Sequence, residues 1–175
     1  AVSLLGRSPS WSGRHPAFGT RNVLFKLAKT YVELLAPEGE GALADALRER
    51  LAEKGPGLHA LALGTRDADA AAARLREAGL AASEPVAGMA HDEPSGAFRR
   101  FRNVVLPPSE TFGVGLFVIE HLSEPELLPP ALPIGDERAA ATGVDHVVVM
   151  TAHPERAIGL YGERLGIRLA LDRTF

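Results

Sequence analysis

Two glutamates in this chain stand in otherwise apolar segments that predict β-strands. Glu33 lies within residues 31–35, and Glu120 lies within residues 113–121. A glutamate on an apolar strand face is costly to bury unless it is paired or bound to a metal ion. The pattern therefore leaves two roles open for each side chain: a metal ligand or polar site group, or a solvated residue at a rim.

Each glutamate follows a copy of one tripeptide, Arg-Asn-Val, which stands at residues 21–23 and again at residues 102–104. A tripeptide that recurs before two similar strands indicates a duplicated module. Its asparagines, Asn22 and Asn103, are candidate substrate contacts. A bend at the same place in a strand of both modules explains them equally well.

Two histidines recur in the same way. His59 and His146 each open an apolar run, and each is followed 20 positions later by a glycine. A lone histidine at the start of a strand is more often a structural residue than a ligand, but the duplication favours a ligand role. His15 lies in a segment that reads as a polar loop able to close over a site, so it is a candidate substrate contact, with a solvated loop histidine as the alternative.

Composition narrows the class of protein. The chain has 175 residues, is 46% hydrophobic and carries a net charge of -3, which is ordinary for a soluble globular protein and gives no general attraction to nucleic acid or anionic membranes. The basic run at residues 99–102 reads as a solvated strand edge in preference to an anion site. The absence of cysteine excludes disulfides and thiolate sites and favours a cytoplasmic location. No segment approaches the roughly 18 apolar residues of a membrane span.

The first 57 residues predict the second part of a module followed by a helix. Residues 4–6 resemble the end of a helix with its terminal glycine. After a polar loop, residues 22–27 and 31–35 predict two strands joined by a tight turn. Leucines at every fourth position predict an amphipathic helix over residues 42–54, ended by Gly-Pro-Gly.

The next segment, residues 58–123, predicts one complete βαβββ module. Asp67 is the expected N-cap of a helix that reaches Ala78, and Gly79 is expected in the left-handed conformation. The remaining elements are strands at residues 58–63, 80–87, 98–106 and 113–121, with a flexible loop over residues 88–96.

The chain then begins the pattern again. Residues 124–142 are rich in proline and predict a linker. Residues 143–175 predict the first part of a further module, with a strand at 144–150, a helix that begins at Pro154, and another strand at 167–172. We therefore expect divisions after residues 57, 123 and 142, and a chain that is a fragment, a permuted gene or a segment that pairs with a second chain. Open strand edges at such divisions predict a homodimer.

These segments resemble the glyoxalase-like domains of the vicinal oxygen chelate superfamily. The resemblance is carried by residues 13–22 with residues 31–37, and by residues 145–149 leading to Tyr161 and Gly166. It implies an α+β fold of paired βαβββ modules, whose mixed sheets curl into open cups with flanking helices. Many members bind a divalent metal ion with ligands from the first and fourth strands of each module.

The resemblance also implies a ligand set for this chain. It places Glu33 and Glu120 at the fourth-strand positions and His59 at the first-strand position of the complete module, with a fourth ligand expected on a strand before Ala1. His146 holds the equivalent position of the next module and would fill that place in a permuted or swapped chain. Histidine and carboxylate ligands without sulfur suit iron(II), manganese, nickel, cobalt or zinc. Members that have lost ligands make a metal-free site an alternative.

The implied activity is that of a small-molecule enzyme. A divalent metal would polarise a substrate with adjacent oxygens in a lyase, isomerase or dioxygenase reaction, with Glu33 or Glu120 as the base. The alternative is a metal-free protein of the bleomycin-resistance kind that binds a small molecule. We expect a small-molecule partner in either case, with no nucleic acid and no membrane.

Overall fold

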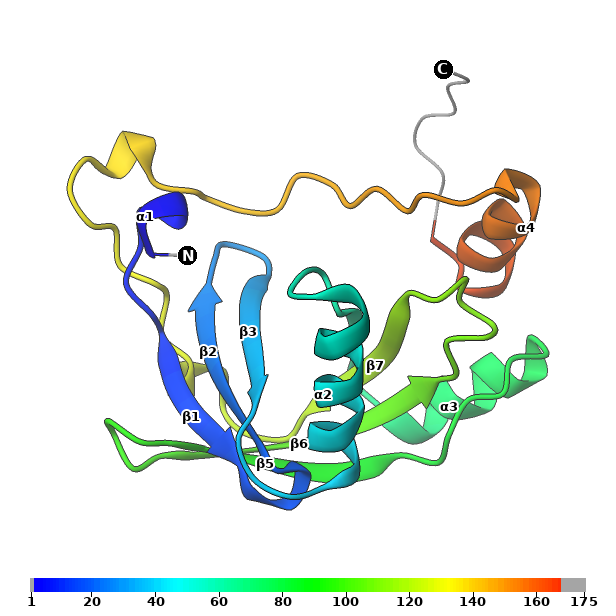
Figure 1. Cartoon of the computed structure of the whole chain (residues 1–175), viewed down its shortest axis with the longest axis horizontal. Coiled ribbons are helices and arrows are strands. Elements are labelled where there is room, and N and C mark those ends of the chain that lie inside the picture. The colour runs from blue at the N-terminus through cyan, green and yellow to red at the C-terminus, as the bar shows by residue number, and fades with distance from the viewer. Residues whose placement is uncertain (1, 168–175) are drawn as a thin grey trace. The chain divides into compact units, whose positions relative to one another are not determined.

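The computed structural model of the chain describes residues 2–167. Seven strands form one mixed sheet, hydrogen-bonded in the order β3-β2-β1-β5-β6-β7-β4, and helices flank it (Figure 1). The predicted α+β class, a mixed sheet with flanking helices, is therefore confirmed. In the described part of the chain, none of the helices has the length and apolar character to cross a membrane.

The strands and helices have the following bounds. The strands are β1 (Trp11–His15), β2 (Thr20–Lys26), β3 (Tyr31–Pro37), β4 (Ala60–Thr65), β5 (Val86–Asp92), β6 (Phe98–Leu106) and β7 (Gly115–His121). The α-helices are α1 (Val2–Leu5), α2 (Ala42–Lys54), α3 (Ala68–Glu77) and α4 (Pro154–Ile158). Short helical turns are η1 (Pro16–Phe18), η2 (Pro125–Leu127), η3 (Glu137–Ala139) and the π-helical η4 (Gly159–Arg164).

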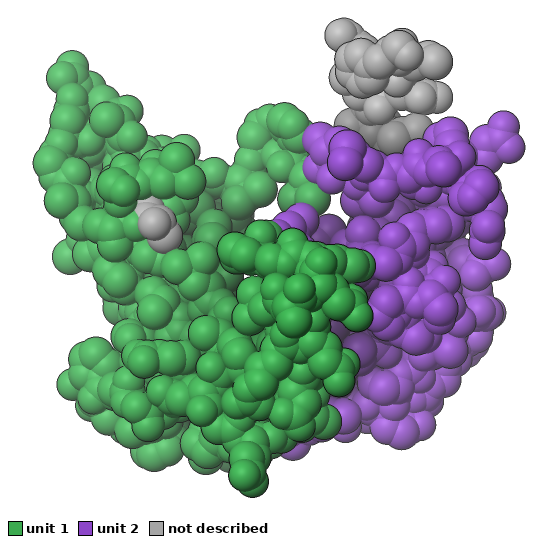
Figure 2. Space-filling model, viewed as in Figure 1, with its two compact units in different colours: residues 1–57, 88–101, 122–147 green, residues 58–87, 102–121, 148–175 purple. Residues whose placement is uncertain are grey.

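The chain divides into two compact units (Figure 2). Unit 1 contains residues 1–57, 88–101 and 122–147, and unit 2 contains residues 58–87, 102–121 and 148–175. Their borders cut across strands β5 and β6, so the module boundaries expected after residues 57, 123 and 142 remain a prediction.

Unit 1 is built on three antiparallel strands, with β2 between β1 and β3. Apolar side chains of β1 and β2, among them Trp11, Leu24 and Phe25, are almost fully buried, and α2 packs against β3. Residues 124–142, predicted as a linker, belong to this unit. Arg7 donates hydrogen bonds to the carbonyl oxygens of Ala131 and Ala141.

Unit 2 is built on the parallel pair β4 and β7 and on helix α3. Asp67 caps α3, because its Oδ1 accepts a hydrogen bond from Ala70 N at 2.9 Å, and Gly79 has the predicted positive φ of 76°. The core is a set of small and branched apolar side chains from α3 and the segment after it, from β6 and β7, and from η4 and the residue after it: Ala68, Ala71, Ala72, Leu75, Leu80, Ala82, Val104, Leu106, Leu116, Val118, Leu160 and Leu165.

Three predictions of local structure were wrong. Residues 11–15 form a strand where we expected a loop, and β5 covers residues 86–92 where we expected a strand at 80–87 and a loop at 88–96. These two strands pair with each other at residues 13–14 and 91–92, so their structure comes from a contact remote in sequence. Residues 144–150 form no strand. The strand predicted at 167–172 lies almost wholly outside the described residues.

Candidate functional site

The polar residues of unit 1 gather on one face of its three antiparallel strands. Cross-strand pairing joins His15 to Thr20 and Gly13 to Asn22, and it joins Leu24 to Glu33. Paired residues point to the same side of a sheet, and side chains alternate along each strand. His15, Thr20, Asn22 and Glu33 therefore share one face, and we call these four residues the His15–Glu33 cluster.

A chain of hydrogen bonds connects the cluster. The Asn22 side-chain amide donates to Glu33 Oε1 at 2.8 Å and lies 3.3 Å from His15 Nε2. His15 Nδ1 lies 3.0 Å from Thr20 Oγ1. Because the amide nitrogen can only donate, His15 Nε2 must accept, and the ring proton is on Nδ1, which donates to Thr20. Asn22 thus holds one oxygen of the Glu33 carboxylate and leaves Oε2 to other partners.

His15 is held in its neutral form. The residue is 7% exposed, and burial, together with the positive charge of Arg99, lowers the pKa of its imidazole to about 4. A charged imidazole here would lose hydration without gaining an acidic partner, which is why the neutral form is favoured. His15 therefore positions Asn22 and does not itself supply a proton near neutral pH.

Glu33 lies at the accessible end of the cluster. The residue is exposed, yet the protein atoms around its carboxyl group displace water and raise its pKa above the ordinary glutamate value, while the Asn22 hydrogen bond and the charge of Arg99 act in the opposite direction. Nearby Tyr31 has its pKa raised to about 12, first by burial and then by the Glu33 charge. The face thus combines a carboxylate of raised pKa with a phenol that keeps its proton.

A cationic side chain and several aromatic rings accompany the cluster. The guanidinium carbon of Arg99, on β6, lies 5.5 Å from the centre of the Trp11 ring. The His15 ring packs against Phe101 at 5.9 Å and Phe18 at 6.2 Å between centroids. Sequence reasoning missed Arg99 and Tyr31. Strand alternation offered a signal, because it puts Arg99 and Phe101 on one side of β6 and separates them from Arg100 and Arg102.

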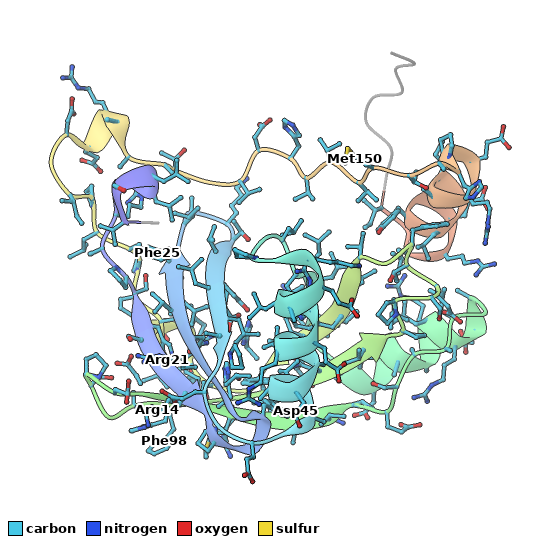
Figure 3. The ribbon with its side chains drawn as sticks, in the orientation of Figure 1. Arg14, Arg21, Phe25, Asp45, Phe98 and Met150 are labelled. Atoms are coloured by element: carbon cyan, nitrogen blue, oxygen red, sulfur yellow. The ribbon has the colours of Figure 1, made fainter. Side chains whose placement is uncertain are left out.

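On the opposite face, β1 and β2 carry a set of surface charges. Arg14 and Arg21, labelled in Figure 3, both bind Glu38 and Glu93, with the shortest nitrogen-to-oxygen distance, 2.9 Å, between Arg14 and Glu93. All four side chains are substantially exposed. Exposed ion pairs of this kind contribute little to stability, and we assign them no role in the site.

Glu120, the counterpart of Glu33 in the repeat, has a different setting in unit 2. Its Oε2 accepts a hydrogen bond from Ala68 N at 3.2 Å, at the start of α3, and lies 3.5 Å from Arg102 Nη1. Arg102 also forms a bidentate pair with Asp69. A carboxylate is favoured at a helix N-terminus, where backbone N–H groups have no helical partner. Glu120 is thus engaged in holding α3.

The other predicted site residues are dispersed. Asn103 lies on β6, and its buried Oδ1 has no hydrogen-bond partner within the described residues, as is also true of Asn22 Oδ1. His59 precedes β4 and is partly buried. His146 is exposed, with Nδ1 2.8 Å from Asp145 Oδ2, and it lines an open hollow beside the turn at residues 28–30.

These placements decide how well each unit by itself fits a metal ion. Unit 1 contains Glu33 and His146, and unit 2 contains His59 and Glu120. Over residues 2–167, no group of three or more histidine, cysteine, aspartate or glutamate side chains is arranged to hold a metal ion. Glu33 shares a hydrogen bond with Asn22, and Glu120 is engaged with α3 and Arg102. Neither unit alone therefore fits the predicted metal centre.

Comparisons with known proteins agree on the family. The family model described as a glyoxalase-like domain matches residues 1–142. A Streptomyces coelicolor methylmalonyl-CoA epimerase variant, solved in complex with 2-nitronate-propionyl-CoA, is 26% identical, with a TM-score of 0.55 over 70% of this chain and 84% of that one. No match is found among curated proteins.

Two more distant structures support the fold alone. Methylmalonyl-CoA epimerase from Mycobacterium tuberculosis is 24% identical, with a TM-score of 0.53 over 72% of this chain and 77% of that one. A hypothetical protein from Staphylococcus aureus is 17% identical, with a TM-score of 0.57 over 69% of this chain and 52% of that one. With a family model that covers most of its length, this chain belongs to the glyoxalase-like family of the vicinal oxygen chelate superfamily.

Proposed function

We propose that this chain is a small-molecule enzyme in which the Glu33 carboxylate removes a proton from a carbon next to a carbonyl group. The observation that carries the proposal is the His15–Glu33 cluster, which holds the Glu33 carboxylate, of raised pKa, through Asn22. A carboxylate of raised pKa is a stronger base. The similarity to a methylmalonyl-CoA epimerase at 26% identity supports a reaction of this type.

The proposed step gives each group a defined part. The C–H bond of the substrate breaks, the proton moves to Glu33 Oε2, and the electron pair moves onto the carbonyl oxygen to form an enolate. Asn22 keeps the carboxylate in place through Oε1, and Tyr31, protonated because of its raised pKa, donates a hydrogen bond to the enolate oxygen. Protonation of the enolate by water on the opposite face of the carbon completes an isomerisation, and expulsion of a leaving group from the adjacent carbon with its bonding electrons completes a lyase reaction.

The test compares Glu33→Gln with Glu120→Gln. Both variants remove one carboxylate from equivalent positions of the repeat, so Glu120→Gln is the matched control. With methylmalonyl-CoA and 2-oxobutyrate as probes in D₂O, mass spectrometry measures deuterium incorporation next to the carbonyl. We expect Glu33→Gln to lose about 100-fold or more of the exchange rate, as is typical for removal of a general base, and Glu120→Gln to stay within a few-fold. Equal rates in Glu33→Gln and the parent would refute the base assignment.

Metal dependence is a separate proposal. A divalent-metal-dependent lyase, isomerase or dioxygenase would need the predicted ligands Glu33, His59, Glu120 and His146 to act together. Elemental analysis of the purified protein, of Glu33→Ala and of His59→Ala tests it. Near-stoichiometric metal that both substitutions remove would support a shared centre, whereas metal content that neither substitution changes would count against it.

The alternative function is metal-free binding of a small molecule. It is favoured by the aromatic side chains next to the cluster, Trp11, Phe18 and Phe101. A protein of this kind would bind an apolar probe without any exchange that depends on Glu33. Homodimer formation is also a proposal, and light scattering at several concentrations tests it, with a monomer throughout as the contrary result.

A further inference from the structure

We propose that Thr20 is a positioning residue for the Glu33 base. By accepting the Nδ1 proton of His15, Thr20 selects the imidazole tautomer that directs the amide nitrogen of Asn22 toward the Glu33 carboxylate. This inference rests on the proposed function of Glu33 and deepens it, because it names a residue two side chains away from the carboxylate that controls how the carboxylate is held.

The backbone holds Thr20 opposite His15. The two residues form the cross-strand pair that closes the β1–β2 hairpin, with the helical turn η1 between them. Gly19, which precedes Thr20, has a φ of 63°, and a Cβ added there would lie 2.2 Å from the carbonyl oxygen of Glu40. The turn therefore requires glycine, and it presents the Thr20 hydroxyl to the imidazole from a defined position.

The His15 ring is held in one orientation. It meets the ring of Phe101 edge-on, with centroids 5.9 Å apart, and its centroid lies 6.2 Å from that of Phe18. Each ring nitrogen therefore keeps its own partner, Thr20 Oγ1 at 3.0 Å from Nδ1 and Asn22 Nδ2 at 3.3 Å from Nε2. What remains free in a neutral imidazole is the choice of the nitrogen that carries the proton.

The tautomer of His15 decides which end of the Asn22 amide faces Glu33. One atom, Asn22 Nδ2, makes both contacts, with His15 Nε2 and with Glu33 Oε1. When the ring proton is on Nδ1, Nε2 accepts and the amide donates to both neighbours. When the proton is on Nε2, the ring favours the amide oxygen in place of the nitrogen, and an amide turned over in this way places Oδ1 against the carboxylate. The Nδ1–H tautomer is therefore the one that holds Glu33 through an attractive contact.

Thr20 stabilises this tautomer because it supplies the acceptor. Without the Thr20 hydroxyl, the Nδ1–H group of His15 would be a buried donor that has lost its acceptor, which is costly. Thr20 is 2% exposed and Asn22 is 3% exposed, so bulk water does not replace either partner. Loss of the hydroxyl therefore shifts the ring toward the Nε2–H form and the amide toward the orientation that repels Glu33.

The first measurement is the tautomer of His15. A ¹H–¹⁵N correlation through the carbon-bound ring protons distinguishes a protonated ring nitrogen from an unprotonated one, and comparison with His15→Gln assigns His15 among the six histidines. We expect Nδ1–H in the parent, a shift toward Nε2–H in Thr20→Val, and Nδ1–H again in Thr20→Ser, which restores the hydroxyl. Thr111→Val is the matched control, because it removes another buried, hydrogen-bonded hydroxyl, in unit 2.

The second measurement is deuterium exchange with methylmalonyl-CoA and 2-oxobutyrate as probes. We expect Thr20→Val to lower kcat by about 10-fold, the effect of one lost hydrogen bond. KM should change little, because Thr20 acts on the base and not on the substrate. Thr20→Ser should recover most of the rate. Thr111→Val should keep the rate even where thermal unfolding shows that it is as destabilised as Thr20→Val.

Three results would overturn the proposal. The first is an Nε2–H tautomer in the parent, which needs no variant and so decides the question even if Thr20→Val does not fold. The others are an unchanged tautomer in folded Thr20→Val, and Glu33-dependent exchange that Thr20→Val leaves unchanged. Failure of the proposed function is distinguishable. If Glu33→Gln keeps the exchange rate, the base assignment fails, and the tautomer measurement alone decides whether Thr20 orients the cluster.

Discussion

Glu33 and Glu120 occupy equivalent places in a repeated sequence but have opposite surroundings. Glu33 is held by Asn22 on an accessible face with an arginine and a tyrosine nearby. Glu120 accepts from the first N–H of α3 and lies beside Arg102, with its side chain 15% exposed. The two glutamates thus differ in role, a candidate base in unit 1 and a structural anchor in unit 2.

The physical origin of this difference is the face on which each side chain lies. In unit 1, Asn22 and Glu33 share a face and hydrogen-bond to each other. In unit 2, Val104, Leu106, Leu116 and Val118 pack with α3, so by alternation Glu120 points toward α3 and Asn103 points away from it. A shift of one residue in a strand moves every side chain to the other face. By the same alternation, the side chain of His121 points away from α3, as that of Asn103 does.

The largest stability effect expected within unit 1 comes from His15. Its pKa is about 4 in the folded protein and about 6.5 when unfolded, so the unfolded chain binds a proton first as the pH falls. Neutral His15 should therefore make its whole contribution to the free energy of unfolding above pH 6.5. That free energy should decrease by about 3 kcal/mol on going to pH 4. Urea unfolding at pH 7 and pH 4.5 measures this.

The contribution of His15 is isolated with His15→Gln, which should show a flatter pH dependence than the parent. His146→Gln, a change at an exposed histidine of the same unit, is the matched control. Glu33 acts in the opposite direction, because its raised pKa favours the folded state as the pH falls, so only the difference between variants is diagnostic. An equally steep dependence in His15→Gln and the parent would show that His15 is not held neutral by burial.

A second test compares glycines on strands of the two units. A Cβ added at Gly13 would lie 2.1 Å from the His91 carbonyl oxygen and 2.6 Å from Trp11 Nε1, whereas one added at Gly64 would meet nothing within 4 Å. We expect Gly13→Ala to lower the free energy of unfolding by about 2 kcal/mol, because β1 and β5 would have to separate. Gly64→Ala should change it little. Thermal unfolding of both variants is the measurement, and equal values would contradict the close packing at β1.

The smallest effect concerns the anchoring role of Glu120. Glu120→Gln should lower the free energy of unfolding by about 1 kcal/mol, since it removes a negative charge from the start of α3 and from Arg102. Glu33→Gln should leave stability unchanged or raise it, because the carboxylate it replaces is held against a cost in hydration. Denaturant unfolding of both variants and of the parent measures these two changes. A larger loss for Glu33→Gln would reverse the assignment of roles.

Much of this arrangement could be predicted from the sequence where local signals were strong. Leucine spacing predicted the helix at 42–54 with its observed bounds, Asp67 predicted the cap of α3, and the strand predicted at 98–106 has the bounds of β6. The strands at residues 11–15 and 86–92 were missed, because each has glycine and polar residues in its interior and is defined by pairing with the other. The expected strand at 144–150 shows the reverse case, a strongly apolar run that pairs with no strand among residues 2–167.

Part of the candidate site could also be predicted from local sequence signals. The repeat singled out Asn22 and Glu33, and an expected loop position singled out His15. The structure brings these three together. Arg99 and Tyr31 were missed, because their place beside Glu33 depends on the register of strands far apart in the sequence. The different setting of Glu120 also depends on register and on the helix that packs over it, neither of which the tripeptide repeat encodes.

The most direct test of the contrast between the two glutamates is an NMR titration of their side-chain carboxyl carbons, assigned with Glu33→Gln and Glu120→Gln. The account predicts that Glu33 titrates above the ordinary glutamate value, and that its pKa rises further in Asn22→Ala and in Arg99→Gln, because each substitution removes a group that lowers it. A Glu33 pKa at or below the ordinary value, unmoved by either substitution, would contradict the claim that unit 1 holds this carboxylate as a base.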